Sequence, residues 1–195
     1  MAPRQEVVLV RHGETEWSAS GQHTSTTDVA LTDRGRAQGA ALGPVLAAWR
    51  FAAVLTSPLS RARDTCRLAG LDAGVEADER LREWDYGEHE GRTTEEIRRD
   101  DPGWTVWRGP CPGGESIEDV AARADAVITR VAAIDGDVAL FSHGHLLRVL
   151  AARWAGLAAV EGRMLVLDTA GLGVLGYERE QRALRRWNEV PDLRA

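Results

Sequence analysis

Apolar runs at residues 7–10, 52–56 and 138–141 recur along the chain, and longer amphipathic segments separate them. Polar or glycine residues bound the runs, a pattern typical of parallel strands that are buried on both faces. Shorter runs at 166–167 and 173–177 predict further strands, and a possible edge strand is expected at 184–187. The pattern therefore predicts a sheet whose central strands are parallel.

Helix signals occupy the segments between these strands. Thr32 is a candidate N-cap for an Ala-rich helix that extends to about residue 49. Ser57 followed by Pro58 is typical of a helix start, since serine caps well and proline suits the first helical position. The helix predicted there would carry Arg61 near its beginning.

Further helices are expected in the second half of the chain. Thr93 with Glu96 resembles a capping box for a short helix. Ser116 marks the start of the clearest helix, because apolar residues recur at the spacing of one helix face over 117–134. Another helical stretch follows at 146–154. Strands that alternate with helices in this way predict an α/β fold, a three-layer α/β/α sandwich around a mostly parallel sheet.

Two segments show neither helical nor strand periodicity. Residues 81–92 are dense in charged and aromatic side chains, which favours a functional loop. Residues 103–114 hold Trp104 and Trp107 among glycines and prolines and predict an irregular flap, whose tryptophans either line a substrate site or pack as a satellite core. We expect a single domain over residues 1–195.

Composition narrows the choice of partners. The formal net charge is −6, which argues against a nucleic-acid partner. All basic residues are arginine, a good ligand for oxyanions, but a GC-rich genome also favours arginine. No segment reaches the roughly 18 continuous apolar residues of a membrane span, and no signal peptide is evident. We expect no membrane partner and a cytoplasmic protein in which Cys66 and Cys111 are free thiols.

Candidate chemistry lies where the predicted strands end. His12 and Arg11 follow the first run, Arg61 follows the second, His143 follows the third, and Glu83 lies in the charged loop. Because the carboxyl ends of parallel strands meet at one edge of a sheet, we expect these side chains to share a cleft. The set suits phosphoryl transfer: a neutral imidazole nitrogen attacks phosphorus, arginines bind the equatorial oxygens and a carboxylic acid protonates the leaving oxygen. This chemistry requires no metal and no cofactor.

Plainer interpretations exist for each residue. A lone histidine after a strand is more often structural, and Arg61 on a helix is by default a surface arginine. His143 and His145 with Glu83 form an alternative metal site, although the histidine pair has no third ligand near it in sequence. Several acids in or beside the same loop compete with Glu83 as proton donor: Glu79, Asp85, Glu88 and Glu90.

Several motifs occur in one order along the chain. They are RHGETEW at 11–17, LTDRGRAQ at 31–38, TSPLSRARDT at 56–65, LREWDYGEHEG at 81–91, GGES at 113–116 and SHGH at 142–145. With these motifs the chain resembles the histidine phosphatase superfamily, in the branch that includes phosphoglycerate mutases and acid phosphatases. The resemblance covers nearly the whole chain and implies a phosphoglycerate mutase-like fold.

The resemblance implies a role for each candidate. His12 would be the nucleophile that becomes phosphorylated, and Arg11 and Arg61 would bind the phosphate. His143 would complete the phosphate pocket, and Glu83 would be the proton donor. Like-charge repulsion between that carboxylate and a bound phosphate would favour activity at mildly acidic pH.

The chain departs from the family pattern at Ser18, where many relatives carry asparagine. A serine hydroxyl reaches less far toward a phosphate oxygen. Similar substitutions occur in a subgroup that looks like sugar-bisphosphatases and bacterial acid phosphatases, which implies that Tyr86 and Arg148 contact the leaving group or a second phosphate. The residues that the resemblance assigns to substrate binding are Ser18, Gly21, Gln22, His23, Tyr86, Gly144 and Arg148.

The function implied by the resemblance is a metal-independent phosphomonoesterase that acts on small phosphorylated metabolites, including sugar phosphates or bisphosphates. Family mutases tend to be longer, with inserted segments that enclose the substrate, so hydrolysis is favoured over the alternative of a phosphoglycerate mutase. A second alternative is a non-catalytic module that binds a phosphorylated ligand, although all matched positions are intact. The family also implies a homodimer as a partner state.

Overall fold

The computed structural model describes residues 5–193 of the chain. A six-stranded sheet forms its centre, with the strand order β3-β2-β4-β1-β5-β6. Strands β1 to β4 are mutually parallel, whereas β5 and β6 continue the sheet in antiparallel fashion. The strands are β1 (Val7–Arg11), β2 (Phe51–Thr56), β3 (Glu76–Ala77), β4 (Asp137–Ser142), β5 (Leu172–Glu178) and β6 (Gln181–Glu189).

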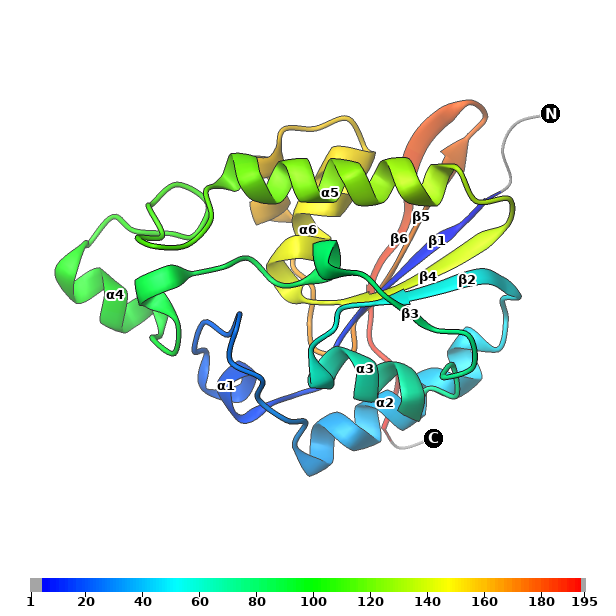
Figure 1. The fold of residues 1–195 in the computed structure, drawn as a ribbon, viewed down its shortest axis with the longest axis horizontal. Helices are drawn as coiled ribbons and strands as arrows, with labels where there is room; N and C mark the ends of the chain where they lie inside the picture. Colours follow the sequence, from blue (N-terminus) through cyan, green and yellow to red (C-terminus); the bar gives the residue numbers. More distant parts are fainter. Residues whose placement is uncertain (1–4, 194–195) are drawn as a thin grey trace.

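Helices cover both faces of the sheet, as Figure 1 shows, with α2 and α3 on one side and α5 and α6 on the other. This arrangement confirms the predicted three-layer fold. The α-helices are α1 (Glu16–Ser20), α2 (Asp33–Leu46), α3 (Ser60–Leu68), α4 (Thr94–Asp100), α5 (Ile117–Ala132) and α6 (Gly144–Trp154), and the short 3-10 helices are η1 (Glu79–Leu81), η2 (Gly87–His89) and η3 (Ala159–Met164).

Alternate residues of β1 serve the two faces. Val7 and Leu9 belong to the apolar cluster that includes the buried side chains of α5 and α6, whereas Val8 and Val10 pack with those of α2 and α3. Successive side chains of a strand point to opposite faces, so a strand covered on both sides must be apolar at every position. This requirement explains the uninterrupted apolar runs.

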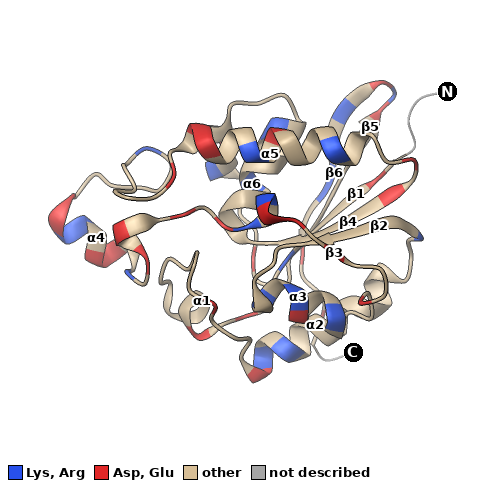
Figure 2. Cartoon of the chain, viewed as in Figure 1, with Lys and Arg blue, Asp and Glu red and all other residues tan. Residues whose placement is uncertain are grey.

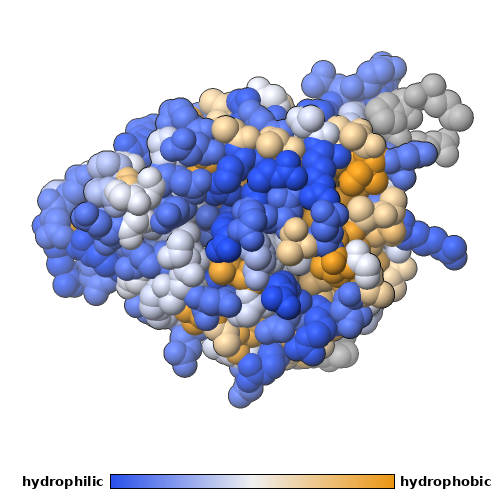
Figure 3. All heavy atoms as spheres, in the orientation of Figure 1, coloured by the Kyte–Doolittle hydropathy of each residue, from blue (hydrophilic) through white to orange (hydrophobic). Residues whose placement is uncertain are grey.

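The surface has the opposite character. Charged residues of both signs are spread over the outer helices, while the central strands carry few (Figure 2). The face seen in Figure 3 is mostly hydrophilic. Within residues 5–193, no helix combines the length and the apolarity needed to cross a membrane.

Helix caps mostly follow the sequence. The capping boxes at Thr93 and Ser116 are present, and the hydroxyl of Thr32 accepts the N–H of Gly35 at 3.0 Å. Helix α2 ends at Leu46, somewhat earlier than predicted. Helix α6 begins at Gly144, two positions before the expected start.

Two predicted features are wrong. Ser57 does not cap α3, because that helix begins at Ser60 with Leu59 as its N-cap, and Ser57 instead contacts a histidine of the site described below. Residues 166–167 form no strand, since the carbonyl of Val166 accepts a side-chain N–H from Trp187 and that of Leu167 accepts one from Arg11.

Five short elements were not predicted: α1, β3, η1, η2 and η3. Strand β3 has only two residues and pairs with the end of β2. Segments this short carry too few positions for a period to emerge from the sequence.

The loop after β1 lies against the start of α2 without any side chain between them. A Cβ added at Gly35 would lie 2.1 Å from the carbonyl oxygen of Glu14, and one added at Gly13 would lie 2.3 Å from the carbonyl oxygen of Gly35. Both neighbours are backbone atoms, so neither can turn away. This close approach fixes the loop that follows His12.

We predict that Gly35→Ala lowers the free energy of unfolding by about 1–3 kcal/mol, the usual cost of overpacking. Gly43→Ala, in the same helix, is the matched control, because its Cβ would meet its nearest neighbour, the carbonyl oxygen of Ala69, at 3.4 Å. That variant should be neutral or stabilised by up to about 1 kcal/mol. Urea unfolding of both variants provides the measurement, and equal stabilities would contradict the prediction.

Candidate active site

A cavity of about 400 Å³ opens beside the carboxyl ends of β1 and β4. Its inner wall comes from the loop after β1 and the start of α6, and its outer wall from residues 18–24 and from the segment around Trp107. The lining residues include Arg11, His12, Ser18, Gly21, Gln22, His23, Glu83, Tyr86, Trp107, Gly144, His145 and Arg148.

His12 presents a free imidazole nitrogen to this cavity. Its Nδ1 lies 2.7 Å from the carbonyl oxygen of Gly13. A carbonyl can only accept, so Nδ1 carries the ring proton and Nε2 keeps its lone pair. Burial lowers the pKa of His12 well below its ordinary value, and the positive charges of Arg11 and Arg61 lower it further. The imidazole is therefore neutral and suited to nucleophilic attack at neutral pH.

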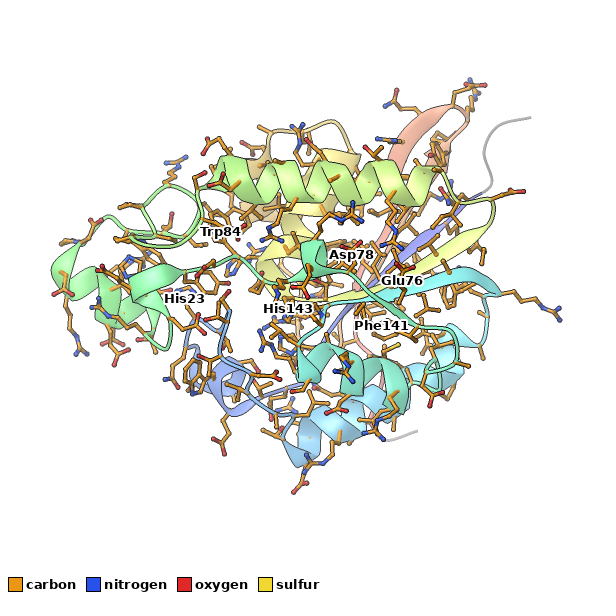
Figure 4. All side chains as sticks on the ribbon, viewed as in Figure 1. His23, Glu76, Asp78, Trp84, Phe141 and His143 are labelled. Atoms are coloured by element: carbon orange, nitrogen blue, oxygen red, sulfur yellow. The ribbon has the colours of Figure 1, made fainter. Side chains whose placement is uncertain are left out.

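His143 lies next to this nucleophile, beneath the cavity. The two ring centroids are 5.2 Å apart, and the side chain of His143 is fully buried near the centre of the molecule (Figure 4). Its Nδ1 accepts the Nε–H of Arg61 at 3.3 Å, and its Nε2 lies 2.8 Å from the hydroxyl oxygen of Ser57. Burial, followed by the charge of Arg61, lowers the pKa of His143 well below its ordinary value.

Arg61 is a buried organising residue in this structure. Besides contacting His143, its guanidinium donates to the carbonyl oxygens of Ser25 and Thr27 at 3.0 Å each and to that of Thr24 at 3.4 Å. Its exposed fraction is 0%, so the surface interpretation of this arginine is wrong.

The segment 24–27 that Arg61 holds is also bound from its other side by Glu90. The carboxylate of Glu90 accepts the backbone N–H of Ser25 at 2.9 Å and that of Thr27 at 3.0 Å. Glu90 is thus a structural acid. The guanidinium of Arg61 binds the carbonyls of segment 24–27 and the carboxylate of Glu90 binds its amides. Together they fix one edge of the site.

Arg11 brings a second cation, which is half-buried. Its Nη1 donates to the carbonyl of Leu167 at 2.6 Å, whereas its Nε is buried and has no hydrogen-bond partner. An unsatisfied buried N–H is costly, so an acceptor is expected to fill this position. Burial lowers the pKa of Arg11, and the carboxylate of Glu83 opposes that shift.

The arginines of the site lack carboxylate partners. Ion pairs within residues 5–193 engage many of the other arginines, but none of these pairs includes Arg11, Arg61 or Arg148. Burying an uncompensated charge is unfavourable, and a bound anion would remove the penalty. The cavity is therefore built to receive an anion.

Glu83 is the acid of the charged loop whose side chain reaches the cavity. Its Oε1 accepts the backbone N–H of Trp84 at 3.0 Å and that of Leu146 at 2.9 Å, and its Oε2 accepts that of His145 at 3.0 Å. The last two amides belong to the first turn of α6, where the helix dipole favours a carboxylate. None of the competing acids, Glu79, Asp85, Glu88 and Glu90, lines the cavity.

Aromatic rings line much of the cavity. The hydroxyl of Tyr86 lies 2.7 Å from Nδ1 of His145, whose ring is 5.3 Å from that of Trp107. The guanidinium of Arg148 stacks on Trp107 at 4.6 Å and donates to the carbonyl of Gly162 at 3.1 Å. His23 lies further toward α4, with its ring 4.7 Å from that of Tyr86.

The structure brings together nearly all the residues that the sequence singled out. Arg11, His12, Glu83 and the whole predicted substrate-binding set line the cavity, while Arg61 and His143 lie beneath it. Ser18 lines the cavity, but its hydroxyl is used at the start of α1, where it accepts the backbone N–H of Thr15 at 2.8 Å in the capping box and donates to the carbonyl of Thr15 at 3.0 Å.

Some participants were missed or given another role. Ser57 looked like a helix cap, and His145 was weighed only as a metal ligand. The two tryptophans of the flap differ, since Trp104 is buried and Trp107 lines the cavity. Within the part of the chain that the structure describes, no cluster of three or more His, Cys, Asp or Glu is arranged to hold a metal ion, so the alternative metal site is not assembled.

Chemically, the arrangement supplies a neutral nucleophile, uncompensated cations and one carboxylate around a single cavity. These are the components of acid-assisted phosphoryl transfer to a histidine.

Known proteins resemble this chain over most of its length. The family model of the histidine phosphatase superfamily (branch 1) matches residues 7–190. The chain is 42% identical over 182 residues to an acid phosphatase of Mycobacterium tuberculosis, an alignment that covers 91% of this chain and 89% of that protein. It is 35% identical over 235 aligned positions to sedoheptulose 1,7-bisphosphatase of Saccharomyces cerevisiae, with 87% and 86% covered.

A solved structure shows the same fold. The product of an open reading frame of Mycobacterium tuberculosis superimposes with a TM-score of 0.91 at 39% identity, covering 95% of this chain and 98% of that one.

We predict that the protein loses stability as the pH falls from 7 to 5. The pKa values of His12, His143 and His145 are lowered well below 6.5 by burial, so the unfolded chain binds protons that the folded chain refuses. Each such histidine should lower the free energy of unfolding by about 1.4 kcal/mol per pH unit below its unfolded pKa.

Urea unfolding at several pH values measures this dependence. In His12→Asn the free energy of unfolding should fall less steeply with decreasing pH, because this variant takes up one proton fewer when it unfolds. A variant with the same pH dependence as the unmodified protein would show that His12 titrates normally.

Proposed function

The chain belongs to the histidine phosphatase superfamily (branch 1), and on that basis we propose that it is a phosphomonoesterase that hydrolyses small phosphorylated metabolites through a phosphohistidine intermediate. The observation that carries this proposal is the neutral His12 beside the buried Arg61 and the half-buried Arg11, neither of which has a carboxylate partner in an ion pair within the described residues. A phosphate dianion supplies the missing negative charge and places its phosphorus next to the nucleophile.

In the first half of the proposed reaction, Nε2 of His12 attacks phosphorus. The bond from phosphorus to the leaving oxygen breaks, and Glu83 in its protonated form gives its proton to that oxygen. Arg11 offers its unpartnered Nε–H to a phosphoryl oxygen. The developing charge is stabilised by groups already in place, which lowers the barrier without rearrangement at the moment of reaction.

In the second half, water replaces the alcohol. The Glu83 carboxylate accepts a proton from this water as its oxygen attacks phosphorus. The bond from phosphorus to Nε2 breaks, phosphate is formed, and His12 regains its lone pair. Glu83 thus returns to the protonated state needed for the next turnover.

The cavity wall that holds Arg148 suits a leaving group with polar or anionic character. Arg148 and the aromatic rings of Tyr86 and Trp107 line that part of the cavity. A ring or sugar can stack on such a wall, and Arg148 can bind a second phosphate. Sugar phosphates and bisphosphates are therefore the substrates that we propose. Phosphoglycerate mutation is the alternative reaction.

We also propose that the protein is cytoplasmic. Cys66 and Cys111 are both free, which suits the reducing cytoplasm. A single domain over residues 1–195 and a homodimer stay predictions.

We predict that the protein releases phosphate from a panel of phosphomonoesters without added metal, and that His12→Ala abolishes the release. The panel includes sugar monophosphates, sugar bisphosphates and 3-phosphoglycerate, with inorganic phosphate as the readout. Isomerisation of 3-phosphoglycerate without phosphate release would support a mutase, and binding without either reaction would support a non-catalytic module.

We predict that Glu83→Gln lowers the rate on an alkyl phosphate by about 10²–10⁴-fold, the usual contribution of a general acid. Measured in a single turnover, the rate of phenol release from an aryl phosphate should change much less, because such a group leaves without a proton and the measurement ends before Glu83 is needed to activate water. Glu88→Gln is the matched control, since Glu88 is exposed and does not line the cavity. Equal losses on the two substrates would argue against Glu83 as the proton donor.

A further inference from the structure

Ser57 is completely buried at the end of β2, where the sequence predicted a helix cap. Its hydroxyl oxygen lies 2.8 Å from Nε2 of His143 and accepts the backbone N–H of Leu59 at 3.3 Å. The function proposed above gives Ser57 no role. Its contact with a histidine of the site nevertheless contributes to where the proton of that histidine resides.

The tautomer of His143 follows from its two partners. Arg61 has only donors, so the Nδ1 that receives its Nε–H must carry a lone pair. In a neutral imidazole the other nitrogen then carries the hydrogen. Nε2–H therefore donates to Ser57, which is the acceptor that this tautomer needs.

The opposite tautomer would disrupt more than one contact. A hydrogen on Nδ1 would face the Nε–H of Arg61, so two donors would oppose each other. Arg61 would have to move, and it is the residue that holds the carbonyls of segment 24–27. The placement of a buried cation and of one edge of the cavity thus depends on which nitrogen of His143 is protonated.

We propose that Ser57 is a positioning residue that, together with Arg61, fixes His143 in the Nε2–H tautomer and thereby helps to hold Arg61 in place for the reaction. This inference rests on the proposed function, because that function makes Arg61 one of the arginines whose charge a bound phosphate offsets. Without the hydroxyl of Ser57, the Nε2–H of His143 is buried without an acceptor, and this cost weakens the preference for the tautomer that the Nε–H of Arg61 favours.

The experiment combines NMR with kinetics. Selective ¹⁵N labelling of the five histidines gives the protonation state of each ring nitrogen, and His143→Asn assigns the signals of His143. The unmodified protein should show a protonated Nε2 and an unprotonated Nδ1 at His143. The reverse pattern would overturn the inference, whatever the variants do.

Ser57→Ala should shift His143 to a mixture of tautomers and lower kcat about tenfold to hundredfold, the loss that is usual for groups that orient metal-bound histidines by the same kind of hydrogen bond. Ser57→Thr keeps a hydroxyl and should retain the tautomer of the unmodified protein. Ser142→Ala is the matched control, because Ser142 is equally buried and adjoins His143, but its hydroxyl donates to the carbonyl of Leu81. This control should leave the tautomer unchanged.

Two results would contradict the inference: an unchanged tautomer in Ser57→Ala, or a changed tautomer with unchanged kcat. If Ser57→Ala does not fold, the pattern in the unmodified protein and in Ser57→Thr still decides the question. Failure of the proposed function is distinct, since it would appear as a lack of turnover by the unmodified protein, whereas the NMR pattern requires no turnover.

Discussion

Uncompensated positive charge at the carboxyl edge of the sheet is the constraint on which the rest of the structure depends. Arg61 is fully buried and Arg11 half-buried, and neither makes an ion pair with a carboxylate within the described residues, which is a costly arrangement in a protein. The fold tolerates these charges because backbone carbonyls accept several of the N–H hydrogen bonds that the two guanidinium groups donate. That solution reduces the desolvation cost without neutralising the charge, so affinity for an anion is retained.

The same charge governs the titratable groups around it. His12 and His143 are neutral because burial and neighbouring guanidiniums both disfavour a further positive charge. Glu83 lies near these cations but is bound by amides at the start of α6, so it does not form a closed ion pair with Arg11 or Arg61. Nucleophile, cations and acid can therefore coexist around one cavity.

Local sequence patterns were sufficient to predict much of the fold. The continuous apolar run of β1 reflects burial on both faces, and the apolar face of α5 together with its capping box predicted that helix. The role of Ser57 could not be predicted, because a serine before a proline has the same local signature whether it caps a helix or contacts a distant histidine. The two strand-end residues of that contact are separated by 86 positions in sequence, and only the topology brings them together. The carbonyls of residues 166–167 were likewise taken by side chains of Trp187 and Arg11, which no local period encodes.

The aromatic wall of the cavity has an evolutionary consequence. Trp107 belongs to an irregular segment between α4 and α5, outside the sheet that carries His12 and His143. Insertions, deletions and exchanges of residues are tolerated more readily in such a segment than in a strand. Selection can therefore retune the preference for one leaving group over another by altering this segment, while the part of the chain that handles phosphorus is inherited unchanged.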